Sequence, residues 1–120
     1  MQKQMNKRIV GNEKEELAAL YLTKSGYEIL DRNYWCRFGE LDIVAREGKY
    51  LCFVEVKYRS NCRYGAPDGL ISDQTKMKIC MTSQFYMKEK KYSADTPVRY
   101  DVVLLIEKEV QLIQNAFYYI

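Results

Sequence analysis

The chain has 120 residues, of which 48% are hydrophobic and 29% charged, an ordinary composition for one folded domain spanning residues 1–120. Nineteen Lys and Arg against sixteen Asp and Glu leave a net charge of +3, which permits nucleic-acid binding without requiring it. The absence of His excludes Ser-His and Cys-His catalytic pairs, histidine general bases and His-ligated zinc. Catalysis would therefore rest on carboxylates, Lys, Tyr or Cys.

The four cysteines (Cys36, Cys52, Cys62 and Cys80) lack the spacing of a zinc knuckle or a redox pair. The N-terminus is polar, and no apolar run approaches the ~18 residues of a membrane helix, so we expect neither a signal peptide nor a membrane span. Unpaired cysteines fit a reducing compartment, and we expect a cytoplasmic protein.

The first predicted helix follows residues 1–10, which are polar and basic and are expected to be loosely held. Asn12 is expected to cap it, with Glu15 completing a capping box. The helix is expected to reach Ser25 and to stop at Gly26. Its buried stripe is predicted to contain Leu17, Ala18, Leu20, Tyr21 and Leu22.

Strands are predicted for three segments that follow this helix and for two near the end of the chain. These strands are residues 27–32, 41–46, 50–59, 98–107 and 110–114, with loops at 34–38 and 60–69 and turns at Glu47-Gly48 and Lys108-Glu109. A second helix, capped by Ser72 or Asp73 and reaching about Lys90, is predicted to bury Met77, Met81 and Phe85 with Ile79, Cys80 and Tyr86. The order α-β-β-β-α-β-β predicts an α/β or α+β fold, with a mixed sheet flanked by two helices.

Polar residues on the second and third predicted strands are the main candidates for a catalytic or metal-binding site. With a turn at Glu47-Gly48, Asp42 faces Phe53 and Glu40 faces Glu55. Because paired residues point to the same side of a sheet, Glu40, Asp42, Glu55 and Lys57 share one face. Asp42 and Glu55 are then diagonal neighbours, roughly 7 Å apart.

Carboxylates crowded together repel one another, so a divalent cation would stabilise them. Mg²⁺ or Mn²⁺ is expected because hard cations prefer oxygen ligands, and such an ion activates water and stabilises charge on a phosphate. Lys57 could hold the scissile phosphate or orient the attacking water. The alternative is an exposed polar hairpin face with ordinary surface ion pairs, but Leu51 and Phe53 on the same face argue against a simply solvated surface.

Basic and aromatic residues surround this hairpin. Arg37, Arg59 and Lys76 are the candidate phosphate contacts, joined by Arg63. Tyr34, Trp35, Tyr58 and Tyr64 are candidates for base stacking. Simpler interpretations apply to two other polar segments, a helix cap in Ser72–Lys78 and a strand-start ion pair in Arg99–Asp101.

Several motifs together resemble one bacterial family. They are Glu15–Leu22, Gly26–Leu30, Arg32-Asn33, Gly39–Ala45, Phe53–Arg59 and Arg99–Val103. Their order and spacing over nearly the whole chain resemble the uncharacterised YraN-like family. That family is similar to Holliday-junction resolvases and to PD-(D/E)XK nucleases, with a restriction-endonuclease-like αβββαβ core.

The resemblance implies that Asp42, Glu55 and Lys57 match the catalytic Asp, Glu and Lys of these nucleases. It implies that Glu15 matches their first-helix acid, with Asp42, Glu55 and Glu15 as metal ligands. Glu40 belongs to the family's Gly-Glu-hydrophobic-Asp motif. The chain departs from the family at Lys14, where Gly is usual, and at Tyr100, where Phe is usual; neither position is among these ligands.

The sequence therefore predicts a Mg²⁺-dependent endonuclease acting on DNA, branched or otherwise structured. A homodimer is one assembly that the resemblance allows, since a junction presents two symmetric strands. A nucleic-acid-binding module of the same fold that does not cleave is the main alternative. An interaction subunit that binds neither metal nor DNA is the third interpretation.

Overall fold

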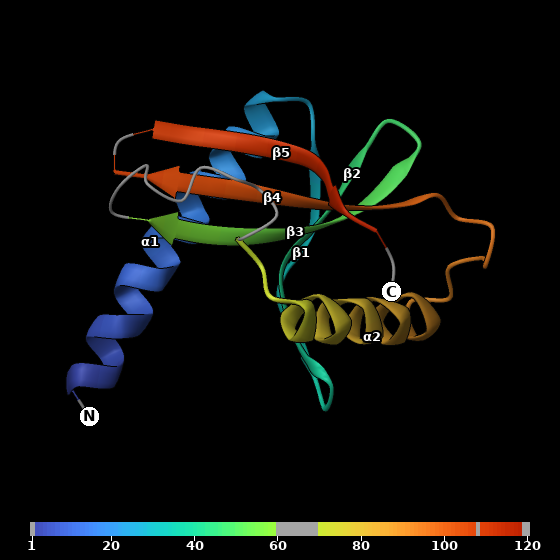
Figure 1. Ribbon diagram of the computed structural model, residues 1–120, viewed down its shortest axis with the longest axis horizontal. Coiled ribbons are helices and arrows are strands. Elements are labelled where there is room, and N and C mark those ends of the chain that lie inside the picture. Colours follow the sequence, from blue (N-terminus) through green and yellow to red (C-terminus); the bar gives the residue numbers. More distant parts are fainter. Residues whose placement is uncertain (1, 60–69, 108, 119–120) are drawn as a thin grey trace.

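The computed structural model describes residues 2–59, 70–107 and 109–118, with residues 2–12 described by their backbone alone (Figure 1). A five-stranded mixed sheet has one helix packed on each face. The elements are α1 (Gln2–Lys24), β1 (Glu28–Cys36), β2 (Gly39–Glu47), β3 (Tyr50–Arg59), α2 (Asp73–Glu89), β4 (Val98–Ile106) and β5 (Glu109–Phe117). This arrangement confirms the predicted α/β fold and its element order.

The strands lie in the sheet in the order of the sequence, β1-β2-β3-β4-β5. β3 and β4 pair in parallel, and α2 lies between them in the chain as the crossover. The other neighbouring strands pair antiparallel, as hairpins allow. In Figure 1 the first turns of α1 extend away from the sheet, while α2 lies along the opposite face.

The core consists of two apolar layers, one on each side of the sheet. The layer under α2 includes Leu41, Val44, Leu51, Phe53, Ile79, Cys80, Tyr86 and Tyr100. The layer under α1 includes Ala18, Leu22, Ile43, Ala45, Cys52, Val54 and Val103. β3 contributes side chains to both layers because it lies in the middle of the sheet, and its first half is therefore one continuous apolar run.

The helix α1 ends as predicted but begins earlier. Gly26 has a φ of +95°, and the amide of Tyr27 donates to the carbonyl of Leu22 at 2.9 Å, which is the pattern of a Schellman motif. The predicted capping box is wrong, because the helix begins at Gln2 and Asn12 lies inside it. The Gln, Lys, Met and Arg residues that precede Asn12 are good helix formers and extend the helix.

The buried faces of both helices differ in part from the prediction. On α1, Ala18 and Leu22 are buried as predicted, but Leu17 and Leu20 are 56% and 52% exposed. Alanines let this helix approach the sheet closely and leave those leucines at its flanks. On α2, Ile79, Cys80 and Tyr86 are buried as predicted, whereas Met77 and Met81 are exposed.

The helix α2 turns hydroxyl groups, in place of its methionines, toward the sheet. Ser83 donates to the Cys80 carbonyl at 2.8 Å, and Thr82 donates to that of Lys78 at 2.7 Å. Hydroxyls bonded inside their own helix can be buried at little cost. The Ser72 cap is confirmed, since its side chain accepts from the amide of Thr75.

Two predicted connections are also corrected. The segment 34–38 is not a loop: β1 continues to Cys36, and the turn is confined to Arg37 and Phe38. The turn after β2 is Gly48-Lys49, because Glu47 pairs with Tyr50, and Gly48 has the positive φ of +60° that a tight hairpin turn requires. The predicted loop 60–69, which includes Cys62, Arg63 and Tyr64, lies outside the described residues, as does Lys108.

Candidate functional site

The strands β2 and β3 separate halfway along their length. Their last paired residues are Ile43 and Val54. In the same register the amide of Val56 would next donate to the carbonyl of Leu41. It donates to Oδ2 of Asp42 instead, at 2.9 Å. The Asp42 carboxylate therefore lies between the two strands and replaces a hydrogen bond of the sheet.

The alternation of side chains along β2 is interrupted at Asp42. Leu41 and Val44 pack on the α2 side of the sheet, and Ile43 packs on the α1 side. In a regular strand Leu41 and Ile43 would share a face. The residue opposite Asp42 in β1 is Asn33, which has a φ of +54°. This irregularity gives the Asp42 carboxylate access to groups from both layers.

Asp42 and Glu55 form a carboxyl pair. The predicted pairing of β2 with β3 is wrong by two residues. The observed pairing ends at Ile43 and Val54, and the next position places Asp42 opposite Glu55 instead of Phe53. The hydrogen bond between Asp42 and Glu55 shows that these two residues come together despite this error in the register. Burial raises the pKa of Glu55 far above its ordinary value, and hydrogen bonding to Asp42 raises it further. Glu55 therefore favours its protonated form, which can donate to Asp42.

Lys57 and Glu40 complete this group of charges. The charge of Lys57 lowers the pKa of Glu55, whereas that of Glu40 raises it. Both side chains therefore lie within electrostatic range of the carboxyl pair. One strand thus supplies an acid and a cation two residues apart, as the sequence predicts.

Glu15 brings a further carboxylate from α1. Burial raises its pKa first, and the charge of Asp42 raises it next. Among the described residues, Oε1 of Glu15 is buried and has no hydrogen-bond partner. The first-helix acid therefore faces the pair on the strands and holds an oxygen ready for a donor or a cation. We refer to Glu15, Glu40, Asp42 and Glu55 as the acid cluster.

The acid cluster fits a hard divalent cation in its donor chemistry. All of its donors are carboxylate oxygens, the ligands that Mg²⁺ and Mn²⁺ prefer. An ion could replace the proton that Glu55 favours, and the unpartnered oxygen of Glu15 could join it. As the described side chains stand, however, no three Asp, Glu or Cys residues surround a point where an ion could sit.

The three predicted phosphate contacts have different surroundings. Arg37 is exposed, and its guanidinium lies 4.8 Å from the centre of the Phe38 ring. Arg59 donates to the main-chain carbonyls of Tyr58 and Leu70. Lys76 is only 18% exposed and pairs with an exposed acid of its own helix. Arg37 is thus the one of the three that points outward with no protein hydrogen bond in the described structure.

Two residues near the acid cluster received no role from the sequence. Arg32 pairs with Glu16 at 2.7 Å, and its charge lowers the pKa of Glu15. Asn33 also forms a hydrogen bond with Glu15 that lowers this pKa. Their signal was the adjacent Arg32-Asn33 pair on the strand beside the first helix.

A second polar cluster lies at the start of β4. Asp101 is completely buried and accepts from Nη2 of Arg99 at 2.9 Å, from the hydroxyl of Tyr27 at 2.7 Å and from the amide of Asn115 at 2.8 Å. Arg99 also pairs with Glu47 at 2.9 Å. The predicted strand-start ion pair is confirmed, and it joins the end of α1 to β4 and β5.

The cysteines offer no nucleophile in the described residues. Cys36, Cys52 and Cys80 are buried free thiols. Burial raises the pKa of Cys52 to about 12, so it stays protonated at neutral pH. Thiol chemistry at this position is therefore excluded, because the thiolate is the reactive form.

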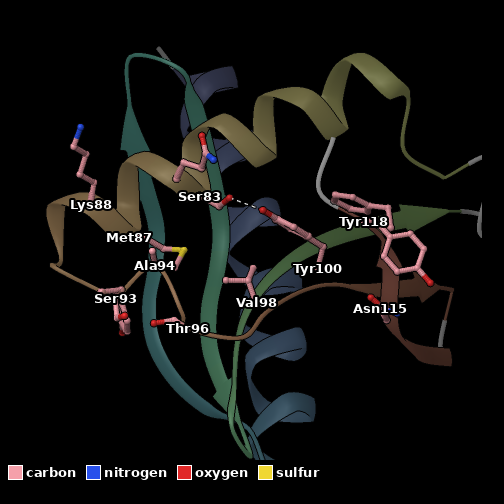
Figure 2. Close-up of a pocket in the computed structure, with 13 residues that line it drawn as sticks. Ser83, Met87, Lys88, Ser93, Ala94, Thr96, Val98, Tyr100, Asn115 and Tyr118 are labelled. Atoms are coloured by element: carbon pink, nitrogen blue, oxygen red, sulfur yellow. Dashed lines mark hydrogen bonds between the residues drawn. The ribbon is translucent and has the colours of Figure 1, made fainter.

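A pocket lies between the end of α2, the following loop and the strands β4 and β5 (Figure 2). Its volume is about 580 Å³. Ser83 and Tyr100 share a hydrogen bond of 2.7 Å on its wall. Its lining contains Met87, Val98 and Phe117 but no acidic residue. The pocket is therefore separate from the acid cluster, and its lining contains no carboxylate that could act as a general acid or base.

Fold and site together define a small α/β protein with a carboxylate centre where its sheet opens. Residues 14–105 match the model of the uncharacterised protein family UPF0102, and the chain belongs to this family. It is 50% identical over 113 residues to a UPF0102 protein of Lachnoclostridium phytofermentans, covering 94% of this chain and 96% of that relative. A UPF0102 protein of Syntrophus aciditrophicus is 42% identical over 107 residues, or 86% of this chain and 84% of the relative. No helix of the described residues is long and apolar enough to cross a membrane.

Proposed function

We propose that this protein is a metal-dependent endonuclease that acts on DNA, branched or otherwise structured, in the cytoplasm. One observation carries the proposal: the buried Glu55 is hydrogen-bonded to Asp42, with Lys57 within electrostatic range. The resemblance of the chain to PD-(D/E)XK nucleases supports it, because the observed order α-β-β-β-α-β is the order of their core.

Each residue of the site has a separate task in this proposal. Asp42 and Glu55 would hold Mg²⁺ or Mn²⁺, and Glu15 would orient a ligand of that ion. A bound ion supplies Lewis-acid charge that lowers the pKa of water and stabilises charge on the phosphate. Lys57 would place its ammonium against the scissile phosphate or the attacking water, as a compact cation on a long stem can do.

Calorimetric titration of Mn²⁺ and Mg²⁺ into the wild type and Asp42→Ala tests the proposal. We expect binding by the wild type, loss of binding in the variant, and metal-dependent cleavage of branched or linear DNA by the wild type alone. Asp73→Ala is the matched control, because Asp73 is an exposed acid on α2. Equal cleavage by wild type and Asp42→Ala would place the chemistry elsewhere.

A DNA-binding module that does not cleave is the second candidate. It is favoured by the side-chain arrangement, in which no three acids of the described structure surround an ion site. This candidate predicts salt-dependent DNA binding that persists without metal and in Asp42→Ala. A homodimer on DNA belongs to the first proposal, and sedimentation of the protein with and without a junction substrate tests it.

A further inference from the structure

The hairpin between β1 and β2 presents a large aromatic side chain to solvent. In Figure 1 this hairpin passes α2 and ends beyond it. Trp35 lies next to its tip and is 75% exposed. Tryptophan is usually well buried, so an exposed one on a folded strand requires an explanation other than core packing.

The tip is held rigidly against α2. The ring of Phe38 packs edge-on against that of Phe85, with centroids 5.9 Å apart. A Cβ added to Gly39 would lie 3.1 Å from Oγ1 of Thr82, so the backbone itself contacts the helix. Cys36 is buried. Trp35 is therefore exposed on a fixed element, which lowers the entropy lost when a ligand binds.

Trp35 is also adjacent to the acid cluster. It pairs with Glu40 across the hairpin, and paired residues point to the same side of a sheet. The charge of Glu40 acts on both Glu15 and Glu55. The indole ring thus lies on the same side of the β1–β2 hairpin as Glu40 of the acid cluster.

A cation accompanies the indole ring. Arg37 follows Trp35 by two residues and lies over the Phe38 ring, exposed to solvent. An aromatic face beside a guanidinium is the combination that binds single-stranded nucleic acid, since bases stack on the ring and the cation binds a phosphate.

We propose that Trp35 is a stacking platform for an unpaired base and that Arg37 binds the neighbouring phosphate. The substrate class is then DNA with unpaired bases, such as a fork, a flap or a single strand, and not a continuous duplex. In a duplex each base is already stacked between its neighbours, and its face is closed to the ring. This inference rests on the proposed function, because it assigns the substrate of that site.

Trp35 reports on its own contacts, because it is the one tryptophan of the chain. Its fluorescence would be followed while single-stranded, forked, blunt duplex and abasic DNA are added in the presence of a chelator. We expect quenching by the single-stranded and forked DNA but not by the duplex or the abasic strand, which has phosphates but no bases. Equal quenching by the abasic strand, or none by any DNA, would overturn the proposal.

Variants separate stacking from general affinity. By anisotropy of a labelled single strand, Trp35→Ala should weaken binding about 10- to 100-fold, the usual effect of losing one stacked base. Tyr118→Ala is the matched control, since Tyr118 is equally exposed beyond β5, and it should bind like the wild type. Arg37→Ala should reduce the slope of the logarithm of the binding constant against the logarithm of salt concentration by about 1. Equal loss in the Trp35 and Tyr118 variants would contradict a specific platform.

The design separates this inference from the function on which it rests. Quenching without any metal-dependent cleavage would support base stacking on Trp35 and contradict the proposed nuclease activity. Cleavage of blunt duplex with unchanged Trp35 emission would support the proposed nuclease activity and contradict base stacking on Trp35. Tighter binding of an RNA strand than of the same DNA strand would overturn the assignment to DNA.

Discussion

Asp101 and Asp42 are both strand carboxylates, yet their surroundings are opposite. Asp101 is saturated by partners of the protein itself: a guanidinium, a tyrosine hydroxyl and a main-chain amide. Asp42 accepts one main-chain amide and otherwise faces other acids. The first arrangement is complete without a ligand and holds the fold together. The second groups several acids, with Lys57 and Arg32 as the cations in electrostatic range, and it is therefore a candidate site for a cation and for chemistry.

Removing the charge at Asp42 should produce the largest effect on function. Asp42→Asn keeps an oxygen for the Val56 amide but loses the charge, so we expect no detectable metal-dependent cleavage and a folded protein. Lys57→Ala should slow cleavage by about 10²–10³-fold, as the loss of one group that stabilises developing charge usually does. Single-turnover cleavage rates measure both.

Lys49→Ala is the control for these variants, because Lys49 is an exposed lysine in the turn beyond β2. Its cleavage rate should match that of the wild type. If Asp42→Asn cleaved as fast as Lys49→Ala, the contrast between the two aspartates would have no functional meaning.

Removing the charge at Asp101 should produce the largest effect on stability. Asp101→Asn leaves Arg99 short of an anion in a site where Asp101 is fully buried, and we expect a loss of about 3–5 kcal/mol in the free energy of unfolding. Urea denaturation measures it. Asp73→Asn should change little, since Asp73 is 92% exposed. A stability loss in Asp42→Asn as large as that in Asp101→Asn would show that both aspartates are structural.

Glu55→Gln should change stability in the opposite direction, by raising the free energy of unfolding. A glutamine amide can donate to Asp42 at any pH, whereas Glu55 must hold a proton to do so, and the free energy of unfolding without metal should therefore rise at neutral pH by roughly 1 kcal/mol. The same variant should lose Mn²⁺ binding in calorimetry. A destabilised Glu55→Gln protein would mean that the carboxyl pair already stabilises the fold by itself.

The pH dependence of stability is a further expected effect of the carboxyl pair. The pKa of Glu55 is raised from 4.5, so the folded state keeps a proton that the unfolded state has released. Stability due to this group is therefore present at low pH and is lost as the pH rises above about 4.5 and through neutrality. Urea denaturation between about pH 5 and about pH 8 should show this decline in the metal-free wild type.

Two comparisons test the origin of that decline. Glu55→Gln should show a smaller slope, because it has no proton to lose at this position. Mg²⁺ should also reduce the slope, because a bound cation stabilises the ionised pair. Identical slopes in the wild type and Glu55→Gln would assign the pH dependence to other groups, such as Glu15, whose pKa is also raised from 4.5.

Much of the fold was predictable because its signals are local. The Schellman motif at Gly26, the Ser72 cap and the apolar run of β3 depend on neighbouring residues alone. The start of α1 and the buried face of α2 were not predictable in this way. Helix propensity outweighed the cap signal at Asn12, and packing against the sheet selected the hydroxyl-bearing face over Met77.

The convergence of the candidate site was predictable for a similar reason. Side chains alternate along a strand, so Glu55 and Lys57 share a face whatever the tertiary context. Asp42 lies beside Glu55 although the predicted register was wrong by two residues. The face switch at Asp42 and the position of Glu15 over it depend on contacts between segments far apart in the chain, which no local pattern encodes.

The sequence by itself determined the element order, the two helix-end signals and the grouping of an acid and a lysine on β3. Only the tertiary structure decided that β2 and β3 separate beyond Ile43 and Val54, that Asp42 fills the opening, and that Trp35 is exposed beside Glu40. The physical reason is that strand separation and exposure result from packing of both helices on the sheet, whereas periodicity and capping act within a few residues of the chain.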